Sequence, residues 1–137
     1  MNVRYLLDAL TAGGKIALMT TTAGCFGLIV YSTASNEKVV YLPYAFIALA
    51  MVSVLLGGLR SGITAGSLGW LHGGLLALLY GVLILIAKAI LFPASADLSA
   101  NTVFLAGLLL AGTAGGVTGV NLRFSRRSRV RRRYLGQ

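Results

Sequence analysis

The fold is decided by the stretch from Leu68 to Phe92, which reads LGWLHGGLLALLYGVLILIAKAILF and contains Lys88 as its one charged residue. At about 1.5 Å per residue, a helix of this length reaches roughly 37 Å. The hydrocarbon core of a bilayer is about 30 Å thick, so such a helix crosses it with some tilt or protrusion. The stretch therefore predicts a transmembrane helix.

The rest of the chain supplies three more apolar segments of similar length. Its 137 residues are 57% hydrophobic and 11% charged, and the mean hydropathy is +0.84. A soluble domain of this size has too little interior for so many apolar side chains, and four spans leave no room for a soluble catalytic domain. We predict an all-α fold, an integral membrane four-helix bundle over residues 1–122, with spans at about 11–31, 39–59, 68–92 and 102–122.

The boundaries of these spans rest on local signals. Residues 1–10 have an amphipathic pattern, which predicts either a short helix in the membrane interface or the start of the first span. Arg60 interrupts the apolar run of the second span, so residues 60–67 are predicted to be a connector. Residues 123–137 form a polybasic tail that we expect to be poorly ordered.

Lys and Arg are unequally distributed between the two sides of the predicted bundle. With the N-terminus inside, the outer side holds only Lys38 and Lys88. Cationic short loops stay on the cytoplasmic side of a membrane, so both termini are predicted to be cytoplasmic. The inner side holds the other ten cationic residues, which are Arg4, Lys15, Arg60 and the seven arginines of the tail.

Small residues recur four apart along the predicted spans. In lipid, helices associate where small residues let their backbones approach closely. The rows admit two interpretations, a self-contained bundle or a bundle with one glycine face left for a partner or a second copy. The main packing residues are Gly57, Gly58, Gly62, Gly69, Gly73, Gly81, Gly107, Gly115 and Gly119, with Gly112 and Gly116 alongside and a weaker row of Gly13, Ala17 and Thr21 in the first span.

Three polar residues within the spans, His72, Tyr80 and Asn121, form a candidate polar site. His72 is the only histidine, and Tyr80 lies near the same helix face eight residues later. An ionisable residue at membrane depth is a functional candidate, and an imidazole that titrates is suited to sensing pH. The alternative is that neutral His72 donates a hydrogen bond to a neighbouring helix and fixes the packing.

No residue set for catalysis, metal binding or a cofactor accompanies these polar residues. The three acids, Asp8, Glu37 and Asp97, lie at span ends or in loops, and Cys25 is the only cysteine. One histidine and one cysteine do not make a metal site, and no nucleophile has a base beside it in a recognisable pattern. We therefore expect a protein that is not an enzyme and binds neither metal nor cofactor.

The C-terminal tail is predicted to bind anionic lipid headgroups, because it follows a span directly and each cationic residue near such a surface is attracted to it. No aromatic pattern indicates specific nucleic-acid binding. The lipid-binding residues are Arg123, Arg126, Arg127, Arg129, Arg131, Arg132 and Arg133.

The segment Gly69-Trp70-Leu71-His72-Gly73-Gly74-Leu75, followed by Leu78-Leu79-Tyr80-Gly81, resembles the signature of the YrzE-like family of small bacterial membrane proteins. The last predicted span, which ends Gly115-Gly116-Val117-Thr118-Gly119-Val120-Asn121-Leu122, is similar to that family's last helix. The resemblance implies four spans in a bacterial plasma membrane. It supplies no activity for these residues.

Two functions fit this sequence. The first is a non-enzymatic accessory or assembly subunit that packs through glycine-rich helix faces, against itself or within a larger membrane complex. The alternative is a small oligomeric transporter or channel subunit with a polar path near His72. Surplus glycine surface favours the first function, and a continuous polar path would favour the second.

Overall fold

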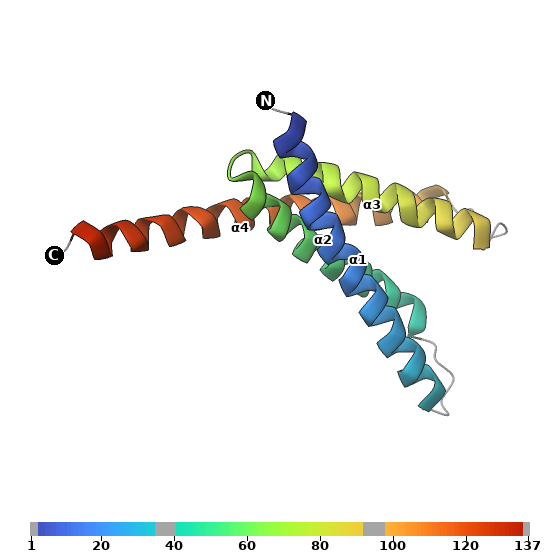
Figure 1. Ribbon diagram of the computed structural model, residues 1–137. Helices are drawn as coiled ribbons and strands as arrows, with labels where there is room; N and C mark the ends of the chain where they lie inside the picture. The colour runs from blue at the N-terminus through green and yellow to red at the C-terminus, as the bar shows by residue number, and fades with distance from the viewer. Residues whose placement is uncertain (1–2, 35–40, 92–97, 136–137) are drawn as a thin grey trace.

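The computed structural model describes residues 3–34, 41–91 and 98–135 of the chain. Every regular element in these ranges is a helix, and all four helices are long and apolar enough to cross a membrane. The architecture is therefore all-α, as predicted. Figure 1 shows the four elements, α1 (Val3–Ala34), α2 (Leu42–Ala65), α3 (Gly69–Leu91) and α4 (Leu98–Leu135).

The helices converge at one end and diverge at the other. α1 packs on α2, α3 packs on α4, and the most extensive interface joins α2 to α4. In Figure 1 the pairs α1–α2 and α3–α4 meet near the turn between α2 and α3, then separate into two arms. The N-terminal end of α1 and the C-terminal part of α4 both lie on the convergent side.

α2 is longer than the predicted span, because a glycine and not the charge at Arg60 ends it. The helix continues through the predicted connector to Ala65, and Gly66 then takes a left-handed conformation with φ of 71°. The Gly66 N–H donates to the Gly62 carbonyl over 3.0 Å, which closes the last turn. A charge at the edge of an apolar run does not stop the helical backbone, so the expectation of a connector was wrong for residues 60–65 and holds only for residues 66 and 67.

α3 begins immediately after a left-handed residue, Leu68, whose φ is 50°. The Leu68 carbonyl accepts the N–H groups of Leu71 and His72 at 3.0 and 3.3 Å, which starts the first turn of the helix. Gly66, Ser67 and Leu68 are thus the whole connection between α2 and α3.

The two terminal helices also extend beyond the predicted spans. α1 is continuous from Val3, so the described N-terminal residues belong to the same helix as the first span. α4 remains helical to Leu135, well past the predicted end of the last span at residue 122. Arginine is a strong helix former, and a helix that is already formed grows without a new nucleation step.

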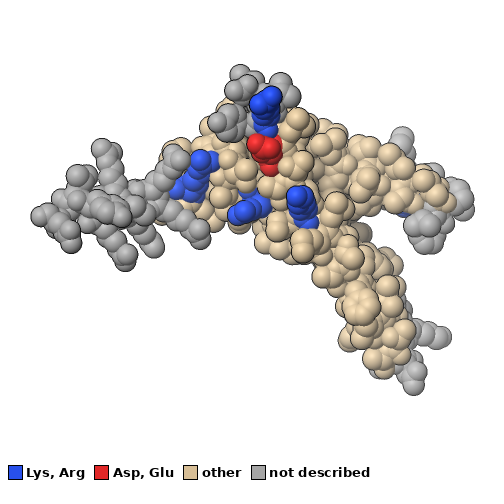
Figure 2. Space-filling view, viewed as in Figure 1, with Lys and Arg blue, Asp and Glu red and all other residues tan. Residues whose placement is uncertain are grey.

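The core lies where the helices converge and consists mostly of small residues. Small side chains let the helix axes approach closely, whereas large apolar side chains lie on the outer surfaces of the assembly. Figure 2 shows the charged residues gathered over the convergent part, with the arms almost uniformly uncharged. The core cluster contains Ala17, Ala50, Val54, Ala77, Tyr80 and Leu108.

Candidate functional site

A junction of glycines from three helices holds the convergent end together. A methyl group placed on Gly58 of α2 would lie 2.5 Å from the Gly112 carbonyl oxygen of α4. One placed on Gly112 would lie 2.6 Å from the Gly73 carbonyl oxygen of α3. No side chain fits between these backbones, so glycine is required on all three helices. The junction comprises Gly58 and Gly62 of α2, Gly69 and Gly73 of α3, and Gly112 and Gly116 of α4.

The remaining predicted packing glycines differ in what surrounds them. Gly115 and Gly119 of α4 lie directly against the backbone of α2, at Leu55 and Leu59. Gly107 instead faces the end of a flexible side chain, since a methyl group there would lie 2.6 Å from Met51 Cε. Gly81 similarly faces the side chain of Leu105. A larger residue is therefore better tolerated at Gly81 and Gly107.

The row in α1 that looked weaker in the sequence makes an equally close contact. A methyl group on Gly13 would lie 2.6 Å from the Gly57 carbonyl oxygen and 2.9 Å from Ser61 Cβ. One on Gly57 would lie 2.9 Å from Ala17 Cβ. α1 thus lies on the face of α2 that carries Gly57, and α4 lies on the face that carries Gly58.

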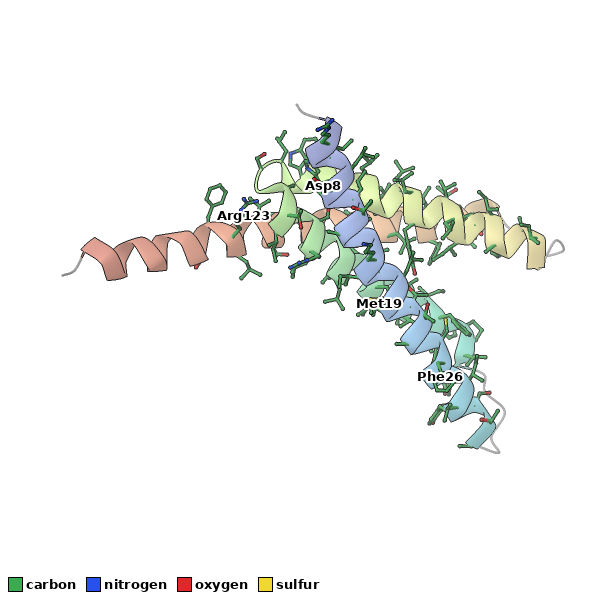
Figure 3. All side chains as sticks on the ribbon, viewed as in Figure 1. Asp8, Met19, Phe26 and Arg123 are labelled. Atoms are coloured by element: carbon green, nitrogen blue, oxygen red, sulfur yellow. The ribbon has the colours of Figure 1, made fainter. Side chains whose placement is uncertain are left out.

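One face of α1 has no partner among the described residues. A methyl group added at Gly27 would have no atom within 4 Å. Met19 and Phe26 are 69% and 70% exposed on the same side of the helix, and Figure 3 shows their positions along the α1 arm. We call this surface the open face of α1; it comprises Met19, Ala23, Phe26, Gly27 and Val30, all of them exposed.

The three residues of the predicted polar site are not brought together. His72 is buried, and its Nδ1 lies 3.0 Å from the Leu68 carbonyl oxygen. Because a carbonyl only accepts, Nδ1 carries the hydrogen, and the partner lies on the chain just before α3 and not on a neighbouring helix. Tyr80 is buried with its hydroxyl against that of Thr21 on α1. Asn121 is exposed on α4.

From the sequence, Thr21 is predicted only as a small packing residue, and Ser53 is not identified as a polar candidate. In the structure, the Thr21 hydroxyl contacts that of Tyr80 between the helices of the chain, and Ser53 of α2 is fully buried. The sequence signal for a buried Ser53 was its position four residues before Gly57, because residues four apart share a helix face.

Arg123 contacts protein atoms and was predicted to contact lipid. Its Nη1 donates to the carbonyl oxygens of Ile63 and Thr64 at 3.0 and 2.9 Å. These carbonyls belong to the last turn of α2, where no intrahelical donor remains. Figure 3 shows Arg123 on α4 beside the end of α2. The side chains of the other predicted lipid-binding residues, Arg126, Arg127, Arg129, Arg131, Arg132 and Arg133, lie outside the described residues.

A second polar contact joins the two helices of the α3–α4 arm. The Lys88 Nζ donates to Asn101 Oδ1 over 2.8 Å. In the described ranges, no three His, Cys, Asp or Glu side chains lie close enough together to hold a metal ion.

A family model described as "Protein of unknown function (DUF3792)" matches residues 5–119 of the chain, a range that covers α2 and α3 completely, nearly all of α1 and the first part of α4. Neither the curated proteins nor the solved structures give a match.

Proposed function

The chain belongs to the DUF3792 family of proteins of unknown function, and we propose that it is a non-enzymatic accessory or assembly subunit of a larger membrane complex. The proposal places it in the bacterial plasma membrane as a multi-pass protein and identifies its family with the YrzE-like one. Its small size supports the proposal, since four membrane-length helices occupy nearly all of the described chain.

The proposed orientation puts the convergent end and both termini in the cytoplasm. Arg4, Lys15 and Arg60 are exposed there, and Figure 2 shows the cationic side chains gathered over that end. Short cationic segments are retained on the cytoplasmic side. In this orientation the two arms point outward through the bilayer.

The observation that carries the proposal is a mismatch between burial and composition in α1. In the most apolar 18-residue stretch of each helix, only 6% of the residues are buried in α1, against 28% in each of the other three helices, yet the membrane-length stretch of α1 has the lowest mean hydropathy of the four. A helix surrounded mostly by lipid is expected to be the most apolar. A protein partner against α1 resolves the mismatch.

The open face of α1 is suited to a transmembrane helix of another protein. Ala23 and Gly27 are small residues four apart, the spacing that lets two helices pack closely in lipid. Met19 and Phe26 flank them with large apolar side chains. The glycines of the other helices are occupied within the chain, so this face is the surplus small-residue surface. We take the occupant to be a helix of a larger membrane protein.

Photo-crosslinking in native membranes tests this assignment. A photoreactive phenylalanine analogue at Phe26 should form an adduct with one other membrane protein, while the same analogue at Leu83, which is 56% exposed on α3, should not. An adduct at twice the mass of this chain would instead identify a second copy. Adducts with lipid alone at both positions would overturn the proposal.

A substitution at Gly27 tests the same face independently. Gly27→Leu should abolish recovery of the partner while leaving the fold unchanged, because no atom lies within 4 Å of the added Cβ. Thermal unfolding of the purified protein in detergent checks the fold. Undiminished recovery of the partner would contradict the proposed docking face.

The arginines of the tail are proposed to bind anionic lipid headgroups and no specific nucleic acid. Each cationic residue close to an anionic surface contributes about 1 kcal/mol, less when neighbours repel one another. The full chain reconstituted with anionic lipid should lose its tail to trypsin more slowly than in zwitterionic lipid. Equal cleavage rates, checked on a soluble arginine peptide as control, would count against lipid contact.

A further inference from the structure

A charged residue, Lys15, lies on the same side of α1 as the open face. Lys15, Met19 and Phe26 recur at i, i+4 and i+11, a spacing that places them on one face of a helix. All three are exposed, and Figure 3 shows Met19 and Phe26 in succession along α1. Gly13 and Ala17, which pack on α2, lie on the opposite side. A transmembrane helix that covers the open face therefore also covers Lys15.

Contacts between α1 and α2 fix the depth of Lys15. Gly57 of α2 lies against both Gly13 and Ala17, so Lys15, midway between these two residues in the sequence, is level with Gly57. Arg60 lies three residues nearer the convergent end of α2, or about 4.5 Å along the helix axis. In the proposed orientation Lys15 thus lies deeper in the bilayer than Arg60, within the membrane-length apolar segment of α1.

Lys15 has no polar partner in the part of the chain that the structure describes. Lys88 donates to Asn101 across the α3–α4 arm, but the ammonium group of Lys15 has no such contact among the described residues. An ammonium group that a second helix covers is strongly destabilised unless an opposite charge compensates it. Docking on the open face therefore requires that the docked helix supply an acceptor for Lys15.

Asp8 adds an opposite charge to the same row. It precedes Lys15 by seven residues, which is about two helical turns, and it is exposed. Figure 3 shows Asp8 on α1 at the convergent end, beyond Met19. The side of α1 that carries the open face thus presents a negative charge nearest the cytoplasm, then a positive charge, and then the apolar surface.

These charges disfavour a second copy of this chain on the open face. Two copies inserted in the same orientation hold each residue at the same depth, and their α1 helices run in the same direction. Lys15 would then lie opposite Lys15, and Asp8 opposite Asp8. Same-sign charges that meet across an interface oppose association. The charges therefore favour a different protein.

We propose that the helix docked on the open face carries an aspartate or glutamate opposite Lys15 and a lysine or arginine opposite Asp8. This inference rests on the proposed function, because it names the chemistry of the partner. The two partner charges lie about seven residues apart, since both helices rise by about 1.5 Å per residue. Both are at the cytoplasmic end of the docked helix, with the basic residue nearer the cytoplasm.

Recovery of the partner from native membranes tests the proposal, once the adduct at Phe26 has identified it. Lys15→Glu should lower recovery at least about tenfold, because it brings two carboxylates together. Lys15→Arg keeps the charge and should recover the partner as the wild type does. Arg60→Glu is the matched control, since it makes the same change of charge at an exposed position of α2, and it should leave recovery unchanged.

Exchange of the two charges is the second test. Replacement of the partner's carboxylate by lysine should restore recovery with Lys15→Glu. Should Lys15→Glu fail to fold, a diazirine analogue of lysine at position 15 replaces it. This analogue keeps the ammonium group and should form an adduct with the partner that is captured at Phe26.

The outcomes separate this inference from the proposed function. No adduct with another protein at Phe26 would overturn both. A partner captured at Phe26 but recovered equally well by Lys15→Glu would overturn only the inference, and so would a docked helix without an acidic residue. Adducts with lipid alone at position 15 would identify a headgroup as the acceptor and contradict the inference. An equal loss in Arg60→Glu would assign the effect to the orientation of the chain, which also contradicts it.

Discussion

The convergent end and the diverging arms of this molecule use opposite kinds of contact. At the convergent end, backbones of α2, α3 and α4 meet through glycines, and no side chain separates Gly58 from Gly112. Along the arms, large apolar side chains such as Phe26 and Val103 are exposed on the outer surface. The first region holds the chain together, and the second is free to meet lipid or a partner.

The comparison shows how four helices with few large buried residues remain associated. Among the residues that the structure describes, only Leu108 and Val54 are large apolar side chains that are fully buried. Hydrophobic burial therefore contributes little between the helices, and close backbone contact must supply most of the attraction. Changes at the convergent end should consequently affect folding, and changes on the arms should affect binding.

The largest effect is expected from Gly116→Leu at the centre of the junction. The added Cβ would collide with the Gly69 carbonyl oxygen, and backbone cannot move aside as a side chain can. We expect a loss of about 3 kcal/mol in the free energy of unfolding, the upper end of the usual cost of overpacking, measured by denaturant titration in detergent. Gly27→Leu on the α1 arm is the matched control and should change this free energy by less than about 0.5 kcal/mol.

Equal losses in these two variants would remove the distinction between the two regions. The denaturant titration also separates an effect on the fold from an effect on binding to a partner protein, because it is done on the purified chain. Gly73→Leu and Gly115→Leu should likewise act on the fold, because both residues face backbone within the chain.

A smaller effect is expected at the edge of the convergent end, from Arg123→Ala. This change leaves the Ile63 and Thr64 carbonyls without their donor at the end of α2. Because Arg123 is only half-buried, we expect a loss of about 1–2 kcal/mol in the free energy of unfolding. Arg60→Ala, at an exposed arginine, is the control. Should both variants unfold alike, the contact with α2 contributes nothing measurable.

The smallest effect is expected on the α3–α4 arm, from breaking the hydrogen bond between Lys88 and Asn101. Hydrogen bonds between helices in membranes average about 0.6 kcal/mol. A double-mutant cycle with Lys88→Met and Asn101→Leu should return a coupling energy of that size. A coupling energy larger than the loss measured for Arg123→Ala would mean that this arm contact contributes more to stability than the contact at the edge of the convergent end.

Much of this architecture was predictable from apolar length and the spacing of small residues. The stretch from Leu68 to Phe92 predicts a helix by length alone, and α3 occupies nearly all of it. The rows containing Gly58 and Gly73 predict close packing without indicating the partner. That partner depends on which helix faces which, and Gly58 meets Gly112 because α4 crosses α2 at that point.

The errors came from assigning too much weight to charge. Arg60 does not end α2, and the arginines after Arg123 do not end α4, because a charged side chain removes none of the backbone hydrogen bonds that continue a helix. The prediction for Arg123 considered only lipid, since its side chain can reach the carbonyls of Ile63 and Thr64 only once α4 lies beside the end of α2. His72 is paired with the carbonyl of Leu68, a residue in a left-handed conformation that the sequence pattern did not indicate.

The connection through Gly66, Ser67 and Leu68 has a consequence for biosynthesis. In the proposed membrane topology, three residues cannot reach from one side of a bilayer to the other, so we expect α2 and α3 to enter the lipid as a single hairpin. The orientation of α3 across the bilayer is thereby set by that of α2. A ribosome that has completed only α2 has made one of the two helices that are expected to insert together. A nascent chain halted before residue 91 should therefore be far more accessible to quality-control proteases than one halted just after it.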